Sequence, residues 1–222
     1  MTACGRRSCT SRRRTRAPLA DGFDVQPLTP DRIPDLATLF EEGGDPRWCW
    51  CAYFRVRGRS WSNSTPTENR ELLSGLSARG SAATPSPGLV GYLGDRAVGW
   101  VSLGPREDYE RLAYSNVLAP VDDRPVWSIV CFVVSRHHRR KGLAADLLRA
   151  AVDYARDRGA QTLEAYPIDT SAGRISSASA FHGTLSMFLD AGFEVVDVRH
   201  WNESSPARPI VRRELTPALA GG

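Results

Sequence analysis

A short basic turn is the strongest chemical signal in the sequence. Residues 139–144 read RRKGLA, and they separate an apolar run that ends near Val134 from an amphipathic helix that starts near Gly142. The first amides of a helix have no partner within it, and the helix dipole favours anions there. Glycine lets a phosphate approach these amides closely, and the three cations add charge. The turn predicts a pyrophosphate or polyphosphate cradle; the alternative is a solvated basic turn that caps a strand–helix unit.

The elements that would position this turn alternate between strands and helices. The hydrophobic patterns predict strands over residues 22–28, 89–93, 96–103, 125–135, 162–166, 194–200 and 209–215. They predict helices over residues 29–40, 66–78, 142–158 and 181–191. Thr65 and Glu68 form a capping-box pattern at the second helix. The nearly continuous apolar run at 125–135 is typical of a central strand, and the last two strands are expected to pair antiparallel. The order predicts one α/β domain with a mixed β-sheet flanked by helices.

The turn also resembles a known signature. Arg139-Arg140-Lys141-Gly142-Leu143-Ala144 is similar to the [RQ]-x-x-G-x-[GA] motif of GNAT-superfamily N-acetyltransferases, and the order of elements over residues 22–215 resembles the GNAT fold. The resemblance implies acetyl-CoA as co-substrate, with its pyrophosphate on the backbone amides of Arg140 to Ala144. The pantetheine arm would pair with the strand edge at Phe132, Val133 and Val134.

The reaction that the resemblance implies is a direct attack on the thioester by a primary amine of a small molecule or peptide. A backbone N–H of the strand would stabilise the oxyanion. A non-catalytic acyl-CoA-binding or regulatory module with the same fold is the alternative, because two side chains typical of the family are missing. Ser128 stands where some members carry a carboxylate, and Phe188 stands where many carry a tyrosine.

Three other residues are candidates for the catalytic groups. Glu164, between apolar neighbours on the adjacent strand, would have a raised pKa suited to a base, and Tyr166 could protonate the leaving thiolate. His182 opens the last helix and would titrate in the useful range. The alternatives are a solvent-facing edge glutamate, a core tyrosine, and a capping or surface histidine.

An aromatic stretch at residues 46–61 is the expected wall of the acceptor pocket. Its side chains suit a flat or cationic acceptor, or else they cover the sheet edge. The acceptor-binding candidates are Trp48, Trp50, Tyr53 and Phe54, together with Trp61 and with Asp108 from a later loop. Cys49 and Cys51 lack the partners that a zinc site needs, so no metal is expected.

Charge and composition exclude several function classes. Residues 1–20 contain six arginines and no acid, so the net charge of +4 becomes −2 for the remainder, and nucleic-acid binding is not expected. We expect a disordered basic tail over residues 1–21, an acetyltransferase-like domain over 22–216 and a flexible end at 217–222. No apolar run reaches the ~20 residues of a membrane span. Five cysteines, an odd number, favour the cytoplasm, and a homodimer stays open.

Overall fold

The computed structural model describes residues 20–81, 83–171, 180–202, 205 and 207–215. Nearly all of the expected tail at 1–21 and the whole of 217–222 lie outside these residues. The described part contains a seven-stranded sheet in the order β1-β2-β3-β4-β5-β7-β6, in which only β4 and β5 pair in parallel. The strands are β1 (Phe23–Pro27), β2 (Gly88–Leu93), β3 (Arg96–Pro105), β4 (Trp127–Val134), β5 (Thr162–Ala165), β6 (Glu194–Arg199) and β7 (Arg208–Glu214). The expected mixed sheet and closing antiparallel pair are both confirmed.

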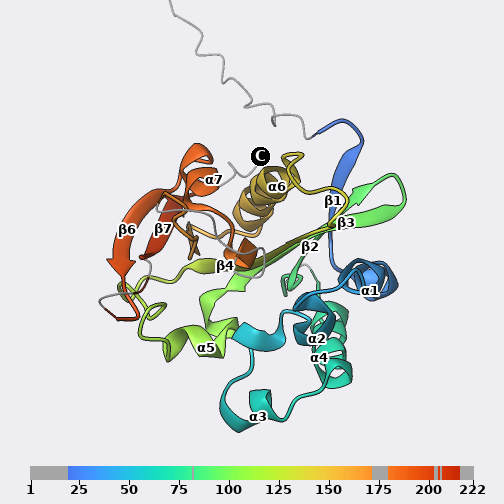
Figure 1. Ribbon diagram of the computed structural model, residues 1–222, viewed down its shortest axis with the longest axis horizontal. Coiled ribbons are helices and arrows are strands. Elements are labelled where there is room, and N and C mark those ends of the chain that lie inside the picture. Colours follow the sequence, from blue (N-terminus) through green and yellow to red (C-terminus); the bar gives the residue numbers. More distant parts are fainter. Residues whose placement is uncertain (1–19, 82, 172–179, 203–204, 206, 216–222) are drawn as a thin grey trace, which may run out of the picture.

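Helices cover both faces of the sheet (Figure 1). The α-helices are α1 (Ile33–Phe40), α2 (Pro46–Cys49), α3 (Gly58–Ser62), α4 (Pro66–Ala78), α5 (Glu110–Ala113), α6 (Leu143–Asp157) and α7 (Leu185–Asp190). Short 3-10 helices are η1 (Pro30–Arg32), η2 (Ala52–Phe54), η3 (Arg106–Asp108) and η4 (Ala180–His182). One core cluster joins α6 and α7 to the sheet, and a second joins residues of α1, α4 and α5 to the opposite face.

Local sequence chemistry explains where two of these helices begin and end. The Thr65 hydroxyl accepts a hydrogen bond from the Glu68 amide at 3.2 Å, and the Glu68 carboxylate accepts one from the Thr65 amide at 2.7 Å. The predicted capping box is therefore confirmed. The helix expected over 181–191 is instead broken at Gly183, because its φ of +78° does not fit an α-helix. A Cβ at this position would lie 2.7 Å from the Met187 Cε atom.

A bulge in β4 opens the sheet beside its second half. Trp127, Ser128 and Ile129 pair with β5, whose last paired residue is Ala165. On the other edge, Leu103 pairs with Ile129 but Ser102 pairs with Cys131, so Val130 is an extra residue. A bulge bends its strand and increases the local twist. Beyond it, β4 continues to Val134 without β5 beside it, which leaves one backbone edge unpaired in the sheet.

Candidate functional site

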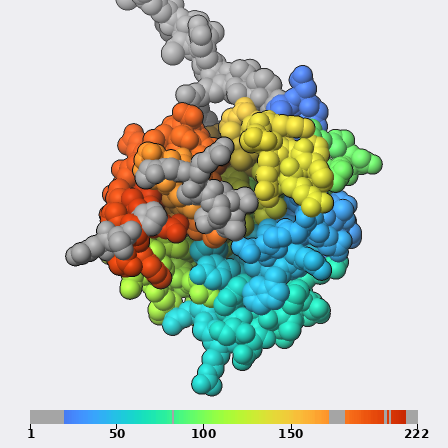
Figure 2. Space-filling model, viewed as in Figure 1, coloured from blue at the N-terminus to red at the C-terminus, as the bar shows by residue number. Residues whose placement is uncertain are grey.

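A cavity of about 1420 Å³ lies beside the unpaired half of β4. Its walls come from the end of β4 with the turn that follows, from the segment between α1 and α3, from residues 115–118, and from η4 with the start of β7. Figure 2 shows the yellow α6 segment, the blue and cyan segments of α1 to α3, and the orange and red C-terminal segments meeting on one face. The large cavity thus joins the predicted phosphate turn to the predicted acceptor wall.

The turn before α6 presents free backbone donors to this cavity. Within the described chain, the amides of Arg140 to Ala144 donate no hydrogen bond to a protein acceptor, and the first helical bonds come from Ala145 and Asp146. Arg140 and Gly142 are left-handed, with φ of +62° and +82°. The residues of the predicted cradle that line the cavity are Arg139, Arg140, Gly142, Leu143 and Ala144; Lys141 is not among them. The exposed turn can therefore offer several amides to one anionic group.

The strand edge beside the turn is fixed by a carboxylate from the opposite wall. Phe132, Val133 and Val134, the residues predicted to contact the coenzyme, line the cavity. The Glu42 carboxylate accepts hydrogen bonds from the Ser135 hydroxyl and the Arg136 amide, both at 3.0 Å. Burial opposes ionisation of Glu42, but these two bonds, together with the nearby positive charges of His137 and Arg96, outweigh it and lower the pKa of Glu42. This bridge ties the end of α1 to the end of β4.

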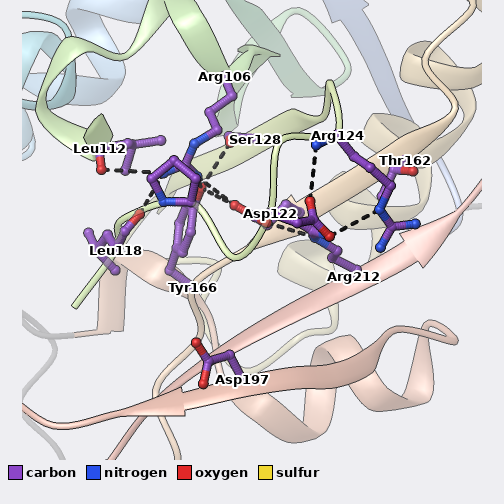
Figure 3. A network of polar contacts seen from close by, with 12 residues as sticks. Arg106, Leu112, Leu118, Asp122, Arg124, Ser128, Thr162, Tyr166, Asp197 and Arg212 are labelled. Carbon is purple, nitrogen blue, oxygen red and sulfur yellow. Dashed lines mark hydrogen bonds and ion pairs between the residues drawn. The ribbon is translucent and has the colours of Figure 1, made fainter. Parts of the chain in front are cut away.

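Glu164 lies in a cluster of charged and polar side chains with Arg106, Tyr166, Arg212 and Asp122. Figure 3 labels these four partners and draws the contacts within the cluster as dashed lines. Arg106 Nη1 donates to Glu164 Oε1 at 2.5 Å, and Arg212 Nε donates to Oε2 at 2.8 Å. The Glu164 side chain has no exposed surface, and it is not among the residues that line the cavity. The glutamate therefore faces neither solvent nor the cavity, and its oxygens accept hydrogen bonds from two arginines.

Tyr166 connects this charge cluster to the cavity. Its hydroxyl donates to Glu164 Oε1 at 2.7 Å, lies 3.0 Å from the Ser128 hydroxyl and accepts from Arg106. The side chain lines the cavity. Burial, followed by the negative charge of Glu164, raises the pKa of Tyr166 well above its usual value. The phenol is therefore protonated at neutral pH and has a proton to donate.

His182 also lines the cavity, but its environment differs from the expected one. Burial, with a smaller effect from the positive charge of Arg208, lowers the pKa of His182 to about 3. The imidazole is therefore neutral near pH 7, which corrects the expectation that it titrates there. Its Nδ1 atom is buried and has no hydrogen-bond partner in the described chain. The ring packs on Phe181, with centroids 4.1 Å apart.

The aromatic stretch divides between the cavity and the core. Four of the aromatic residues expected at the acceptor wall line the cavity: Trp48, Tyr53, Phe54 and Trp61. Trp50 does not, because it and Cys51 both adopt left-handed backbone conformations, and Trp50 packs on Phe40 in the core with ring centroids 5.1 Å apart. Asp108 is also outside the cavity lining: its carboxylate is half exposed and lies 3.7 Å from Arg55.

Several residues of the site carried no signal in the sequence. Arg106 and Arg212 are 58 and 48 residues from Glu164 along the chain. Arg212 reaches it because β7 pairs with β5, and Arg106 reaches it because it directly follows β3, which is separated from β5 only by β4. Arg208, at the start of β7, lines the cavity together with Trp201. An arginine that begins a strand looks like any surface arginine, so only the cavity identifies it.

Two further findings concern metals and membranes. Among the described residues, no three histidine, cysteine or acidic side chains are grouped so as to bind a metal ion. No helix within the same residues combines the length and the apolarity that a membrane crossing requires.

Comparisons with known proteins give one family and many similar folds. Residues 47–176, more than half of the chain, match the model of the acetyltransferase (GNAT) family. Similar solved structures include a GCN5-related N-acetyltransferase from Kribbella flavida (15% identity, TM-score 0.53, 88% of this chain and 99% of that chain covered). A second similar structure is a GNAT-family acetyltransferase from Streptococcus pneumoniae (13% identity, TM-score 0.52, 87% of this chain and 99% of that chain covered).

A third similar structure is the paia N-acetyltransferase from Thermoplasma acidophilum in complex with coenzyme A (14% identity, TM-score 0.50, 86% and 98% covered). At these identities the structures show a shared fold. A search of curated proteins finds no match.

Proposed function

Because the chain belongs to the GNAT acetyltransferase family, we propose that it is an acetyl-CoA-dependent N-acetyltransferase of the cytoplasm. It moves an acetyl group to a primary amine of a small molecule or a peptide. The observation that carries the proposal is the free set of backbone amides at residues 140–144, which opens on the same cavity as the unpaired edge of β4. The free amides suit a diphosphate, and the unpaired strand edge suits an extended chain that contains amide groups.

The binding of acetyl-CoA would use this chain's backbone more than its side chains. The diphosphate lies on the amides of the turn, where the dipole of α6 and the exposed Arg139 and Arg140 favour negative charge. The amide groups of the pantetheine arm pair with the backbone between Val130 and Val134. The thioester then lies near the bulge, with an amide of β4 as the donor to the oxyanion.

In the proposed reaction, two polar side chains that line the cavity take part, Tyr166 and His182. A neutral amine forms a bond to the thioester carbonyl carbon, and the carbon–sulfur bond then breaks. Tyr166 gives its proton to the leaving sulfur, and the phenolate takes up the extra proton that the attacking nitrogen carries once it is bonded to the carbonyl carbon, so the proton count balances. Arg106 and Ser128 stabilise the phenolate, while Glu164 acts as a positioning residue through its bond to Tyr166. The neutral His182 accepts a hydrogen bond from the attacking amine.

A second candidate is a module that binds acyl-CoA without turnover. Ser128 supplies no carboxylate, and Phe188, which stands where many family members carry a tyrosine, is packed in the core against Phe132 and Phe193. Under this alternative Tyr166 serves the charge cluster alone.

The experiment that separates these functions mixes the protein with acetyl-CoA and a panel of amines, and it measures free thiol and acetylated product. The panel contains amino acids, arylalkylamines, polyamines and short peptides. We expect thiol release that requires an amine and is lost in Tyr166→Phe. Coenzyme A binding by calorimetry with no turnover on any amine would instead favour the non-catalytic module. No binding would reject both.

A further inference from the structure

We propose that the acceptor is a primary amine that carries both an aromatic ring and a carboxylate, with Arg208 as the residue that binds the carboxylate. This inference rests on the proposed function, because it names the substrate class of the same cavity. The structure supplies three arguments: an unpaired arginine, the arrangement of the acids, and the occupied faces of the aromatic rings.

Arg208 is a cation without a partner at the acceptor side of the cavity. It lines the cavity, is partly buried, and its side chain makes no ion pair or hydrogen bond in the described chain. Because Ala165 pairs with Val211 and β7 runs antiparallel to β5, Arg208 lies beyond the end of β5, across the gap from the unpaired half of β4. Its charge is close enough to His182 to help lower the pKa of that residue. A carboxylate is the group that a partly buried guanidinium binds best, through paired hydrogen bonds.

The acids of the cavity lie at its other end. Among the described lining residues, the carboxylates are those of Glu42 and Asp45, which directly follow α1. Glu42 is already bonded to Ser135 and Arg136 at the end of β4 that leads into the phosphate turn. An acceptor with a second positive charge would therefore find an arginine, not an acid, beside His182.

In the aromatic wall of the cavity, an arginine of the protein already lies over two of the rings. The Arg111 guanidinium lies 4.0 Å from the centre of the Tyr53 ring and 5.7 Å from that of Trp61. A cationic ligand would compete with this arginine for the same electron-rich faces. The rings of Phe54, Phe181 and His182 pack on one another, and all three line the cavity. This surface suits a flat, uncharged ring in the acceptor.

The test compares acceptors that differ only in the carboxylate. L-phenylalanine is measured against phenethylamine, and L-tryptophan against tryptamine, with spermidine as a cationic amine. Calorimetry in the presence of coenzyme A gives binding, and thiol release from acetyl-CoA gives kcat/KM. We expect each amino acid to bind about tenfold or more tightly than its decarboxylated partner, the ratio expected for a charge-assisted contact. Spermidine should bind more weakly than either amino acid.

Variants then assign the preference to Arg208. Arg208→Met should bring the ratio within each pair close to one, and Arg208→Lys should retain part of it. Arg79→Met, an exposed arginine outside the cavity lining, is the control and should leave the ratio unchanged. Coenzyme A affinity and thermal unfolding verify that each variant is folded.

The binding measurement keeps this inference separate from the proposed function. Carboxylate-dependent binding that Arg208→Met abolishes, without thiol release, supports the ligand class and the role of Arg208 while it rejects catalysis. Equal binding within each pair, tighter binding of spermidine, or a preference that survives Arg208→Met overturns the inference even if the protein acetylates amines. A peptide with an acidic side chain that binds more tightly than the free amino acids would identify a peptide as the source of the same carboxylate.

Discussion

Replacing Glu164 with glutamine tests whether the charge cluster is structural. The substitution keeps the shape of the side chain and removes its charge. It places an amide NH₂ where one carboxylate oxygen accepts hydrogen bonds from Arg106 and Tyr166 at 2.5 and 2.7 Å, or where the other accepts from Arg212 at 2.8 Å. In either orientation a buried donor faces another donor.

The magnitude follows from the burial of the three side chains. Glu164 has no exposed side-chain surface, and Arg106 and Arg212 are 12% and 4% exposed. Removing one partner from a buried ion pair costs about 3–5 kcal/mol, because the remaining charges have lost both water and partner. Arg212 keeps Asp122 at 2.7 Å, and Arg106 keeps the Leu118 carbonyl at 2.6 Å, which favours the lower end of that range.

Urea unfolding and thermal melting measure this loss directly. For a chain of this size, about 3 kcal/mol corresponds to a fall in Tm of roughly 6–12 °C. Glu214→Gln is the matched control, because Glu214 pairs with Arg124 at 3.2 Å but both side chains are more than half exposed. It should cost less than about 1 kcal/mol.

Two results would refute the reasoning on Glu164. Equal stability of Glu164→Gln and Glu214→Gln would show that the arginines do not depend on this carboxylate. A Glu164→Gln variant as stable as the unmodified protein would show that the cluster is not structural, and any fall in its kcat would then follow from the altered contact with Tyr166.

Three further predictions concern the phosphate turn, the buried histidine and the capping box. Gly142 has φ of +82°, and Asp and Asn both tolerate this left-handed backbone, so Gly142→Asp and Gly142→Asn differ only in charge. Calorimetry should show that Gly142→Asp binds coenzyme A more weakly than Gly142→Asn by about 1–2 kcal/mol. Equal affinities would remove the turn from the binding site. The pKa of His182 is lowered to about 3 in the folded protein. Because the unfolded chain binds this proton more readily, stability is lost as the pH falls from about 6.5 to about 3. At pH 5 the loss is about 2 kcal/mol. His182→Gln should remove that part of the pH dependence in urea titrations, and an unchanged profile would contradict the low pKa. Thr65→Ala should cost about 1 kcal/mol by removing the cap of α4, whereas Thr67→Ala, inside the same helix, should cost less in the same unfolding assay.

Local signals in the sequence predicted the parts of the site that depend on neighbours along the chain. The basic turn, the apolar strand before it and the helix after it are adjacent in sequence, so composition and spacing were enough to place them at the cavity. The capping box at Thr65 is equally local, and the structure reproduces it with both hydrogen bonds.

Interactions between distant residues could not be predicted in this way. The partners of Glu164 depend on the pairing of β5 with β7 and on the course of the chain after β3. The direction of Trp50 depends on left-handed backbone conformations at two residues that are not glycine, for which the sequence carries no signal. The break at Gly183 was missed because the apolar spacing around it continues the helical period, while the close contact with Met187 arises only after folding.

The crystal structure of the protein with coenzyme A bound is the most direct test of the central claim. The account predicts the diphosphate within hydrogen-bond distance of the amides of residues 140–144, and the pantetheine arm along the unpaired edge of β4 between Val130 and Val134. A diphosphate bound anywhere else on the chain, or a pantetheine arm that leaves this edge unpaired, would contradict it.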